Sequence, residues 1–163
     1  MIHLIVGNTG AGKSTYASAL KNDSGGVIFS IDQWNTSLFF PDKGSEDGLD
    51  WFLERIERAE SVIMNLVKQL EEAGVDSILD LGLSKFSHRE KFRKFAAGND
   101  FGIKIHFLDI PGETRWERIL QRNRSRGDTF EFEVGREDFD FMEGWFEKPT
   151  DSEMVGGVMI QGE

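Results

Sequence analysis

Hydrophobic residues along the chain form short apolar runs that alternate with longer segments in which apolar positions recur at helical spacing. The short runs are bounded by Gly, Pro, Asn or Asp, a pattern typical of buried β-strands. They predict strands at residues 2–6, 27–31, 75–80, 103–110 and 155–160. Because strands and helices alternate, the pattern favours an α/β fold with a parallel sheet.

The segments between the strands predict helices at residues 13–20, 49–70, 87–98, 113–123 and 139–146. The long second helix follows Pro41, has apolar residues at i, i+3 and i+4 spacing, and is stopped by Gly74. The stretch Ser87-His88-Arg89-Glu90 has the form of a capping box and predicts the start of the third helix.

The alternation breaks at residues 124–138, which are charged, contain glycine and have little hydrophobic pattern. This stretch predicts a loop or flap, and we take residues 122–138 as a lid. The 163 residues contain no internal repeat and no low-complexity linker, so residues 1–163 are expected to form one domain.

Composition narrows the functional class. The chain is 39% hydrophobic and 29% charged, which is ordinary for a globular protein. No apolar run approaches the ~20 residues of a membrane span, and the absence of cysteine excludes disulfides and thiolate metal sites. We therefore expect a cytoplasmic protein with no membrane association. The net charge of −10 disfavours a surface that coats nucleic acid, although a local basic groove stays possible.

A phosphate-binding motif follows the first predicted strand. The segment G-x-x-x-x-G-K-S comprises Gly7, Asn8, Thr9, Gly10, Ala11, Gly12, Lys13 and Ser14, with Thr15 next. Glycines let successive backbone N–H groups point inward, and the following helix adds its positive end. Lys13 is placed to bridge the β- and γ-phosphates, and Ser14 to ligate Mg²⁺. No Asn-Lys-x-Asp element for reading guanine occurs, so ATP is favoured over GTP.

Three carboxylates stand at the carboxyl ends of predicted strands, where ligands lie in open α/β sheets: Asp32, Asp80 and Asp109. Asp80 matches an acid that holds Mg²⁺ or its water. Asp32 is a candidate base for the proton of an acceptor hydroxyl, with a role as metal ligand left open. Each of the three can instead be an ordinary turn or helix cap, most of all Asp109.

An arginine-rich run is unusual in so acidic a chain. Arg115, Arg118, Arg122 and Arg126 share one face if the helix continues through them. One interpretation is a lid in which Arg122 and Arg126 meet the phosphates in the transition state and Arg118 lies near the adenine. The alternative is a solvated face whose arginines pair with glutamates.

Residues 33–58 are the candidate acceptor region. Trp34 can stack on a substrate or wall it off, and Arg55 and Arg58 can hold an anionic group. The alternatives are a packed aromatic side chain and surface ion pairs with Glu54 or Glu57.

The segments GNTGAGKST, FSIDQW, LDLG and ERILQRNRSR together resemble the small P-loop kinase group. That group includes zeta-toxin-like kinases, chloramphenicol phosphotransferase and the kinase domain of polynucleotide kinase, and the likeness is greatest to small bacterial AAA-type ATP-binding proteins. The resemblance implies a three-layer P-loop nucleoside triphosphate hydrolase fold, with a five-stranded parallel sheet of nucleotide-kinase type and a lid after strand 4. It also implies that Asp32 is the base for the acceptor hydroxyl and that the lid arginines lie near Arg122 and Arg126.

These observations predict an ATP- and Mg²⁺-dependent phosphotransferase acting on a hydroxyl of a small molecule. The alternative from another class is an ATP-binding or ATP-hydrolysing switch read by a protein partner. A 5′-kinase acting on nucleic acid is disfavoured by the acidic chain. The acceptor itself is not indicated by any motif.

Overall fold

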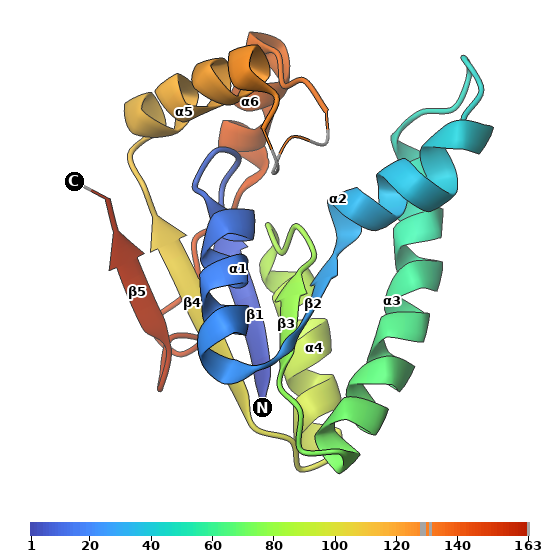
Figure 1. Cartoon of the computed structure of the whole chain (residues 1–163), viewed down its shortest axis with the longest axis vertical. Coiled ribbons are helices and arrows are strands. Elements are labelled where there is room, and N and C mark those ends of the chain that lie inside the picture. Colours follow the sequence, from blue (N-terminus) through green and yellow to red (C-terminus); the bar gives the residue numbers. More distant parts are fainter. Residues whose placement is uncertain (128–129, 131, 163) are drawn as a thin grey trace.

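A five-stranded, wholly parallel sheet forms the centre of the protein (Figure 1). The computed structural model describes residues 1–127, 130 and 132–162. The strand order is β2-β3-β1-β4-β5, and the expected α/β sheet is confirmed. The strands are β1 (Ile2–Gly7), β2 (Val27–Ser30), β3 (Ser77–Asp80), β4 (Ile103–Asp109) and β5 (Val158–Gln161).

Helices cover both faces of the sheet and its carboxyl edge (Figure 1). The α-helices are α1 (Lys13–Ser24), α2 (Ile31–Trp34), α3 (Leu49–Glu72), α4 (Phe86–Gly98), α5 (Gly112–Ser125) and α6 (Arg136–Trp145). A π-helical turn, η1 (Asn35–Phe39), and a 3₁₀ turn, η2 (Phe40–Asp42), extend α2. Within the described residues, no helix is both long enough and apolar enough to cross a membrane.

The core is divided by the sheet into two apolar layers. Alternate residues of β1 point to opposite faces, as the two-residue period of a strand requires. Leu4 and Val6 pack with α3 and α4, whereas Ile5 packs with Ala17 of α1. These side chains are fully buried, so β1 is the central strand of a three-layer domain.

The carboxyl edge of the sheet lies beneath α5 and α6 (Figure 1). A small apolar cluster of Ile119, Val134 and Phe139 packs α5 against α6 and the connection between them. Gly7 of β1 and Asp80 of β3 end at this edge, and the helix carrying Asp32 begins where β2 ends. The helical layer of α5 and α6 therefore lies over the phosphate-binding edge where β1 ends (Figure 1).

Several predicted boundaries are wrong: β3 begins at Ser77 and not at residue 75, and β5 begins at Val158 and not at residue 155. Two other boundaries are set by polar contacts. The capping box at Ser87 does not form, because α4 begins one residue earlier at Phe86, whose N–H donates to the Glu147 carboxylate at 2.8 Å. The strand predicted to include Ile31 ends at Ser30, whose hydroxyl accepts the Gln33 N–H at 3.4 Å and caps α2. In both places a polar contact with a helix N-terminus determines the boundary.

The predicted lid, residues 122–138, spans the end of α5, the connection and the start of α6. Residues 128, 129 and 131 of this prediction lie outside the described residues. The helix that was to carry all the arginines stops at Ser125, because Arg126 has φ 45° and turns the chain away. Arg126 therefore does not share a helical face with Arg122.

Two strand histidines on the α1 side of the sheet belong to a buried polar chain. The His3 Nδ1 and His106 Nε2 atoms lie 2.9 Å apart, and the Tyr16 hydroxyl lies 2.8 Å from His106 Nδ1. Asp76 meets the far nitrogen of His3 at 3.1 Å. Burial, with the charges of His3 and Lys104, lowers the pKa of His106 to about 4, so its ring is neutral at pH 7.

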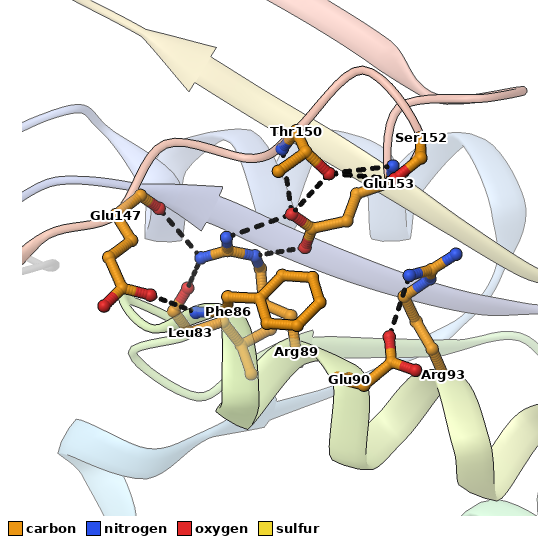
Figure 2. A network of polar contacts seen from close by, with 9 residues as sticks. All are labelled: Leu83, Phe86, Arg89, Glu90, Arg93, Glu147, Thr150, Ser152 and Glu153. Atoms are coloured by element: carbon orange, nitrogen blue, oxygen red, sulfur yellow. Dashed lines mark hydrogen bonds and ion pairs between the residues drawn. The ribbon is translucent and has the colours of Figure 1, made fainter.

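A second buried network ties the C-terminal part of the chain to α4 (Figure 2). The fully buried Arg89 forms a two-pronged ion pair with Glu153, at 2.7 and 3.3 Å. Its remaining N–H groups donate to the carbonyls of Leu83 at 3.1 Å and Glu147 at 2.9 Å. One guanidinium thus joins the loop after β3 to the segment that leads into β5.

We expect Glu153→Gln to lower the free energy of unfolding by roughly 3–5 kcal/mol, because it leaves the buried guanidinium of Arg89 without a counter-charge. Urea denaturation followed by circular dichroism measures this loss. The matched control is Glu90→Gln, which removes a partly exposed pair with Arg93 and should cost less than about 1 kcal/mol (Figure 2).

The advantage of Glu153 over Gln should also depend on pH. Burial raises the pKa of Glu153, but hydrogen bonds from Arg89 and Thr150 outweigh burial and hold the pKa below its ordinary value of 4.5. The advantage is therefore complete above pH 4.5 and shrinks as the pH falls through the lower folded-state pKa. Equal losses in the two variants at pH 7 would contradict the assignment.

Candidate active site

The predicted phosphate-binding loop connects β1 to α1 and has the required backbone. Gly10 has φ +81° and Gly12 has φ +91°, a left-handed conformation that glycine adopts without steric cost. A Cβ on Gly10 would approach the backbone oxygen of Arg115 to 2.6 Å, so α5 packs directly on the loop. A Cβ on Gly12 would meet an Arg118 nitrogen at 3.8 Å and no other described atom within 4 Å. The loop is held tightly on one side and open on the other.

Three polar groups hold the loop beneath α5 and α6. The buried Arg115 donates to the Thr9 carbonyl at 3.1 Å and to the Ile110 carbonyl at 2.8 Å, and pairs with Glu143 at 2.7 Å. The Asn8 amide donates to the same Glu143 carboxylate at 2.6 Å. Sequence reasoning grouped Arg115 with the lid arginines and missed both this contact and Glu143, because no local pattern links residues more than a hundred positions apart.

The residues assigned to Mg²⁺ contact each other. The Ser14 hydroxyl donates to the Asp80 carboxylate at 3.0 Å, and the ammonium of Lys13 lies 3.5 Å from the Asn8 carbonyl. Hydroxyl and carboxylate oxygens are ligands that Mg²⁺ accepts together with phosphate oxygens and water. This pair fits a phosphate-bound Mg²⁺. Across the described chain, no group of three or more His, Cys, Asp or Glu residues is arranged to hold a metal.

One pocket of about 760 Å³ brings many of the predicted residues together. The loop residues that line the pocket are Gly7, Thr9, Gly10, Gly12, Lys13, Ser14 and Thr15. The other predicted site residues that line it are Asp32, Asp80, Arg118 and Arg122. The remaining lining residues are Leu49, Phe52, Gly82, Ser84, Ile119, Phe132, Glu133, Val134, Asp138, Phe141 and Met142. Asn8 and Ala11 belong to the loop but do not line the pocket.

Arg122 is the notable cation of this pocket. Its Nε is buried and has no hydrogen-bond partner among the described residues. Burial lowers the pKa of Arg122, and the negative charge of Asp32 acts in the opposite direction. A buried N–H without a partner is costly, so this site favours a ligand that accepts a hydrogen bond there.

The other two predicted arginines differ in position. Arg118 lies beside the loop and donates to the Ala11 carbonyl at 3.3 Å. Arg126 is exposed, lies 3.8 Å from the Glu133 carboxylate and 5.4 Å from the centre of the Phe130 ring, and does not line the pocket.

The three residues predicted to contact the acceptor lie outside the pocket lining. Trp34 packs edge-on against Phe29, with ring centres 6.3 Å apart. Arg55 stacks on the Trp51 ring at 3.7 Å, and Arg58 pairs with Glu54 on the surface.

Apolar residues from three separate elements line the pocket. Leu49 and Phe52 come from the start of α3, Phe132 from the connection after α5, and Phe141 from α6. The position of Phe52 just after the Pro41 loop was a weak signal that this residue faces the site. Nothing in the local sequence marked Phe132 or Phe141.

Comparison with known proteins identifies the type of fold. A family model described as an AAA domain matches residues 2–149. No curated protein sequence matches the chain significantly. Among solved structures, Chaetomium thermophilum Kti12 in complex with ADP-AlF3 has a TM-score of 0.71 at 15% identity, covering 100% of this chain and 90% of that one.

Two kinases give similar superpositions. A sugar kinase from Janibacter sp. HTCC2649 has a TM-score of 0.62 at 17% identity and covers 98% of this chain and 84% of its own. The APS kinase of Mycobacterium tuberculosis, in complex with AMPPNP and APS, has a TM-score of 0.64 at 17% identity. The superposition covers 99% of this chain and 88% of that one. At these identities the likeness shows the fold, and the three-layer P-loop fold expected from the sequence is confirmed.

We expect Lys13→Ala to weaken MgATP binding roughly 10- to 100-fold, the range for losing a hydrogen bond to a charged group, while the protein stays folded. Isothermal titration calorimetry measures the affinity, and circular dichroism the fold. Lys21→Ala is the matched control, since Lys21 lies in the last turn of the same helix and outside the pocket. Equal affinity in the two variants would remove Lys13 from the nucleotide site.

Proposed function

Since the chain belongs to the AAA domain family and has a P-loop kinase-like fold, we propose that it is an ATP-dependent phosphotransferase acting on a hydroxyl of a small molecule. One observation carries the proposal: Asp32 lines the same pocket as the phosphate loop and Asp80. A carboxylate beside the phosphate site has no necessary role in nucleotide binding alone, whereas transfer to an alcohol needs a proton acceptor there.

The loop residues have defined roles in this proposal. The backbone N–H groups of residues 8–12 and the N-terminus of α1 bind the phosphates of ATP, and Lys13 contacts the β- and γ-phosphates. Ser14 and Asp80 hold Mg²⁺. ATP supplies the transferable phosphoryl group, and Mg²⁺ neutralises part of its charge. Arg118, beside the loop, contacts the nucleotide near its adenine.

The chemical step depends on Asp32 and Arg122. Asp32 accepts the proton of the acceptor hydroxyl as the hydroxyl oxygen bonds to the γ-phosphorus and ADP departs. Arg122 directs its unpartnered N–H toward charge that develops on the transferring group. The segment 122–138 acts as a lid within a single domain of residues 1–163, and closure over bound nucleotide completes the site.

A second function has one observation in its favour. Apolar side chains at Leu38, Leu49 and Leu53 are about half exposed on the segment that flanks the pocket. Such a surface suits a protein partner that reads the nucleotide state, as in an ATP-dependent switch. A switch hydrolyses ATP or holds it, but it modifies no small molecule, and this difference separates the two functions.

With γ-labelled ATP and a pool of metabolites, we expect label to enter a new compound. Asp32→Asn should retain ATP affinity, because the loop is untouched, and should lose transfer by roughly 10²- to 10⁴-fold, the scale of general-base catalysis. Asp109→Asn is the control, since Asp109 also ends a strand but pairs with Lys148 outside the pocket.

Two results would contradict this assignment. Label that enters only free phosphate favours the switch. A fall in ATP affinity for Asp32→Asn, with transfer reduced in proportion, would make Asp32 a metal ligand and not the base.

The two arginines provide a further prediction. Arg122→Ala should slow transfer roughly 10²-fold or more with little effect on ATP affinity, because the oxygens of the transferring group are best placed to meet this guanidinium in the transition state. Arg126→Ala should change the rate less, since Arg126 is exposed and pairs with Glu133 in this structure. Rate and affinity are measured for both variants. A larger rate effect for Arg126 would mean that the lid closes in a way that brings this residue into the site.

A further inference from the structure

The second residue of the phosphate loop uses both ends of its side-chain amide. The Asn8 side-chain oxygen accepts the Thr9 N–H at 2.8 Å, and its nitrogen donates to the Glu143 carboxylate at 2.6 Å. Only an amide can accept at one end and donate at the other in this way, because aspartate lacks the donor and alanine lacks both groups. The G-x-x-x-x-G-K-S pattern allows any residue at this position, so the need for an amide comes from these two contacts.

The carbonyl of Thr9 is held by the same carboxylate through a second residue. The buried Arg115 donates to the Thr9 carbonyl at 3.1 Å, and another of its nitrogens lies 2.7 Å from the Glu143 oxygen that accepts from Asn8. The peptide groups on both sides of Thr9 therefore depend on one oxygen of α6. A rotation of either peptide group would break a hydrogen bond, so these contacts fix the direction of the N–H groups that follow in the loop.

Two groups expected to bind phosphate lie next to this contact. The Asn8 carbonyl accepts the Ala11 N–H at 3.0 Å and lies 3.5 Å from the Lys13 ammonium. Asn8 thus connects the Glu143 carboxylate on one side to a loop N–H and the loop lysine on the other. A displacement of Asn8 would disturb both groups, so the donor geometry that the loop offers to a triphosphate depends on where Asn8 is held.

The carboxylate itself belongs to the helix that forms part of the pocket wall. Phe141 and Met142 line the pocket, and the next residue on α6 is Glu143. The Glu143 side chain is 40% exposed, and without it Arg115 keeps its two carbonyl acceptors. Because partly exposed ion pairs add little to the free energy of unfolding, loss of Glu143 should displace the loop more than it destabilises the fold.

We propose that Glu143 is a positioning residue for the nucleotide: through Asn8 and Arg115 it holds the phosphate loop in the conformation that binds the phosphates. Glu143 does not line the pocket, so it acts through the loop. This inference rests on the nucleotide site of the proposed function. The coupling is reciprocal, because a contact that favours the binding conformation of the loop is favoured by bound nucleotide to the same extent. Nucleotide therefore strengthens the attachment of α6.

The affinity for AMPPNP with Mg²⁺, measured by isothermal titration calorimetry, tests the positioning role. Glu143→Ala and Asn8→Ala should each raise Kd roughly 5- to 20-fold, the range for one or two hydrogen bonds. Because both remove one shared contact, the double variant should bind no more than about twofold more weakly than the weaker single variant, whereas independent effects would multiply. Asp140→Ala is the matched control, since Asp140 is an exposed carboxylate of the same helix that pairs with Arg136 and does not line the pocket.

A rescue pair separates this contact from general damage to the loop. Asn8→Asp keeps an acceptor for the Thr9 N–H but sets two carboxylates against each other, so it should bind AMPPNP at least as weakly as Asn8→Ala. Adding Glu143→Gln restores the wild-type net charge and supplies an amide donor for the new carboxylate, so most of the affinity should return. Thermal unfolding verifies that each variant folds. If Glu143→Ala does not fold, Glu143→Gln alone takes its place, with a smaller expected loss because it keeps an oxygen acceptor.

Hydrogen exchange tests the coupling in the other direction. Saturating AMPPNP with Mg²⁺ should slow amide exchange in residues 139–145 of α6 by roughly the factor by which Glu143→Ala raises Kd. The slowing should be smaller in Asn8→Ala, because this variant breaks the connection between the loop and the helix. A residue that only stabilises the fold would change the unfolding temperature without changing how α6 responds to nucleotide.

Several results would overturn the positioning role: an unchanged Kd in the single variants, effects that multiply in the double variant, no recovery in the rescue pair, or equal slowing of exchange in Asn8→Ala and wild type. The proposed function is judged separately. If the variants behave as expected but no label from γ-labelled ATP enters any acceptor, the positioning role stands and the phosphotransferase proposal fails. If label enters an acceptor and the variants bind AMPPNP as wild type does, the phosphotransferase proposal stands and the positioning role fails.

Discussion

A single buried guanidinium holds the phosphate-binding side of the pocket together. Arg115 contacts the end of β4 through Ile110, the phosphate loop through Thr9, and α6 through Glu143. Because Asn8 donates to the same Glu143 carboxylate, the loop and the helix above it share one acceptor. Loop, sheet edge and covering helix therefore cannot move independently without breaking charge-assisted hydrogen bonds, which are among the stronger polar contacts in proteins.

This coupling has a consequence for the wall of the pocket. Phe141 and Met142 precede Glu143 directly on α6, and Asp138 lies about one turn and a half earlier, so the part of the pocket wall that comes from α6 is attached to the phosphate loop. Ligand-induced shifts of the loop would pass to α6 through Asn8 and Glu143. Just past the same, C-terminal end of α6, the Glu147 carboxylate accepts from the Phe86 N–H of α4 and the Glu147 carbonyl accepts from Arg89 (Figure 2). The C-terminal end of the helix is therefore tied both to the phosphate loop and to α4.

Charges of both signs line the pocket beside the phosphate loop. Lys13 and Arg118 contact loop carbonyls, and Asp80 accepts a hydrogen bond from the Ser14 hydroxyl. Asp32 lies close enough to Arg122 to raise the pKa of that guanidinium, against the effect of burial. Oppositely charged groups fixed in a partly buried pocket interact more strongly than they would in water.

The sequence alone determined the features that depend on local backbone geometry. The order of strands and helices follows from hydrophobic spacing, and the loop at Gly10 and Gly12 follows from glycine's freedom to adopt positive φ. Asp32 and Asp80 were expected at strand ends because parallel strands present those ends at one edge, and both line the pocket. Tertiary structure decided the rest. Arg115 became a buried clamp, and Arg126 turned out of the helix that carries Arg122. Trp34 packed against Phe29 and lies outside the pocket lining with Arg55 and Arg58, whereas Phe132 and Phe141, which no local pattern had marked, line the pocket. The contact of Arg115 with Thr9 joins residues 106 positions apart, and such a contact depends on how distant segments pack, which the spacing of residues along the chain does not encode.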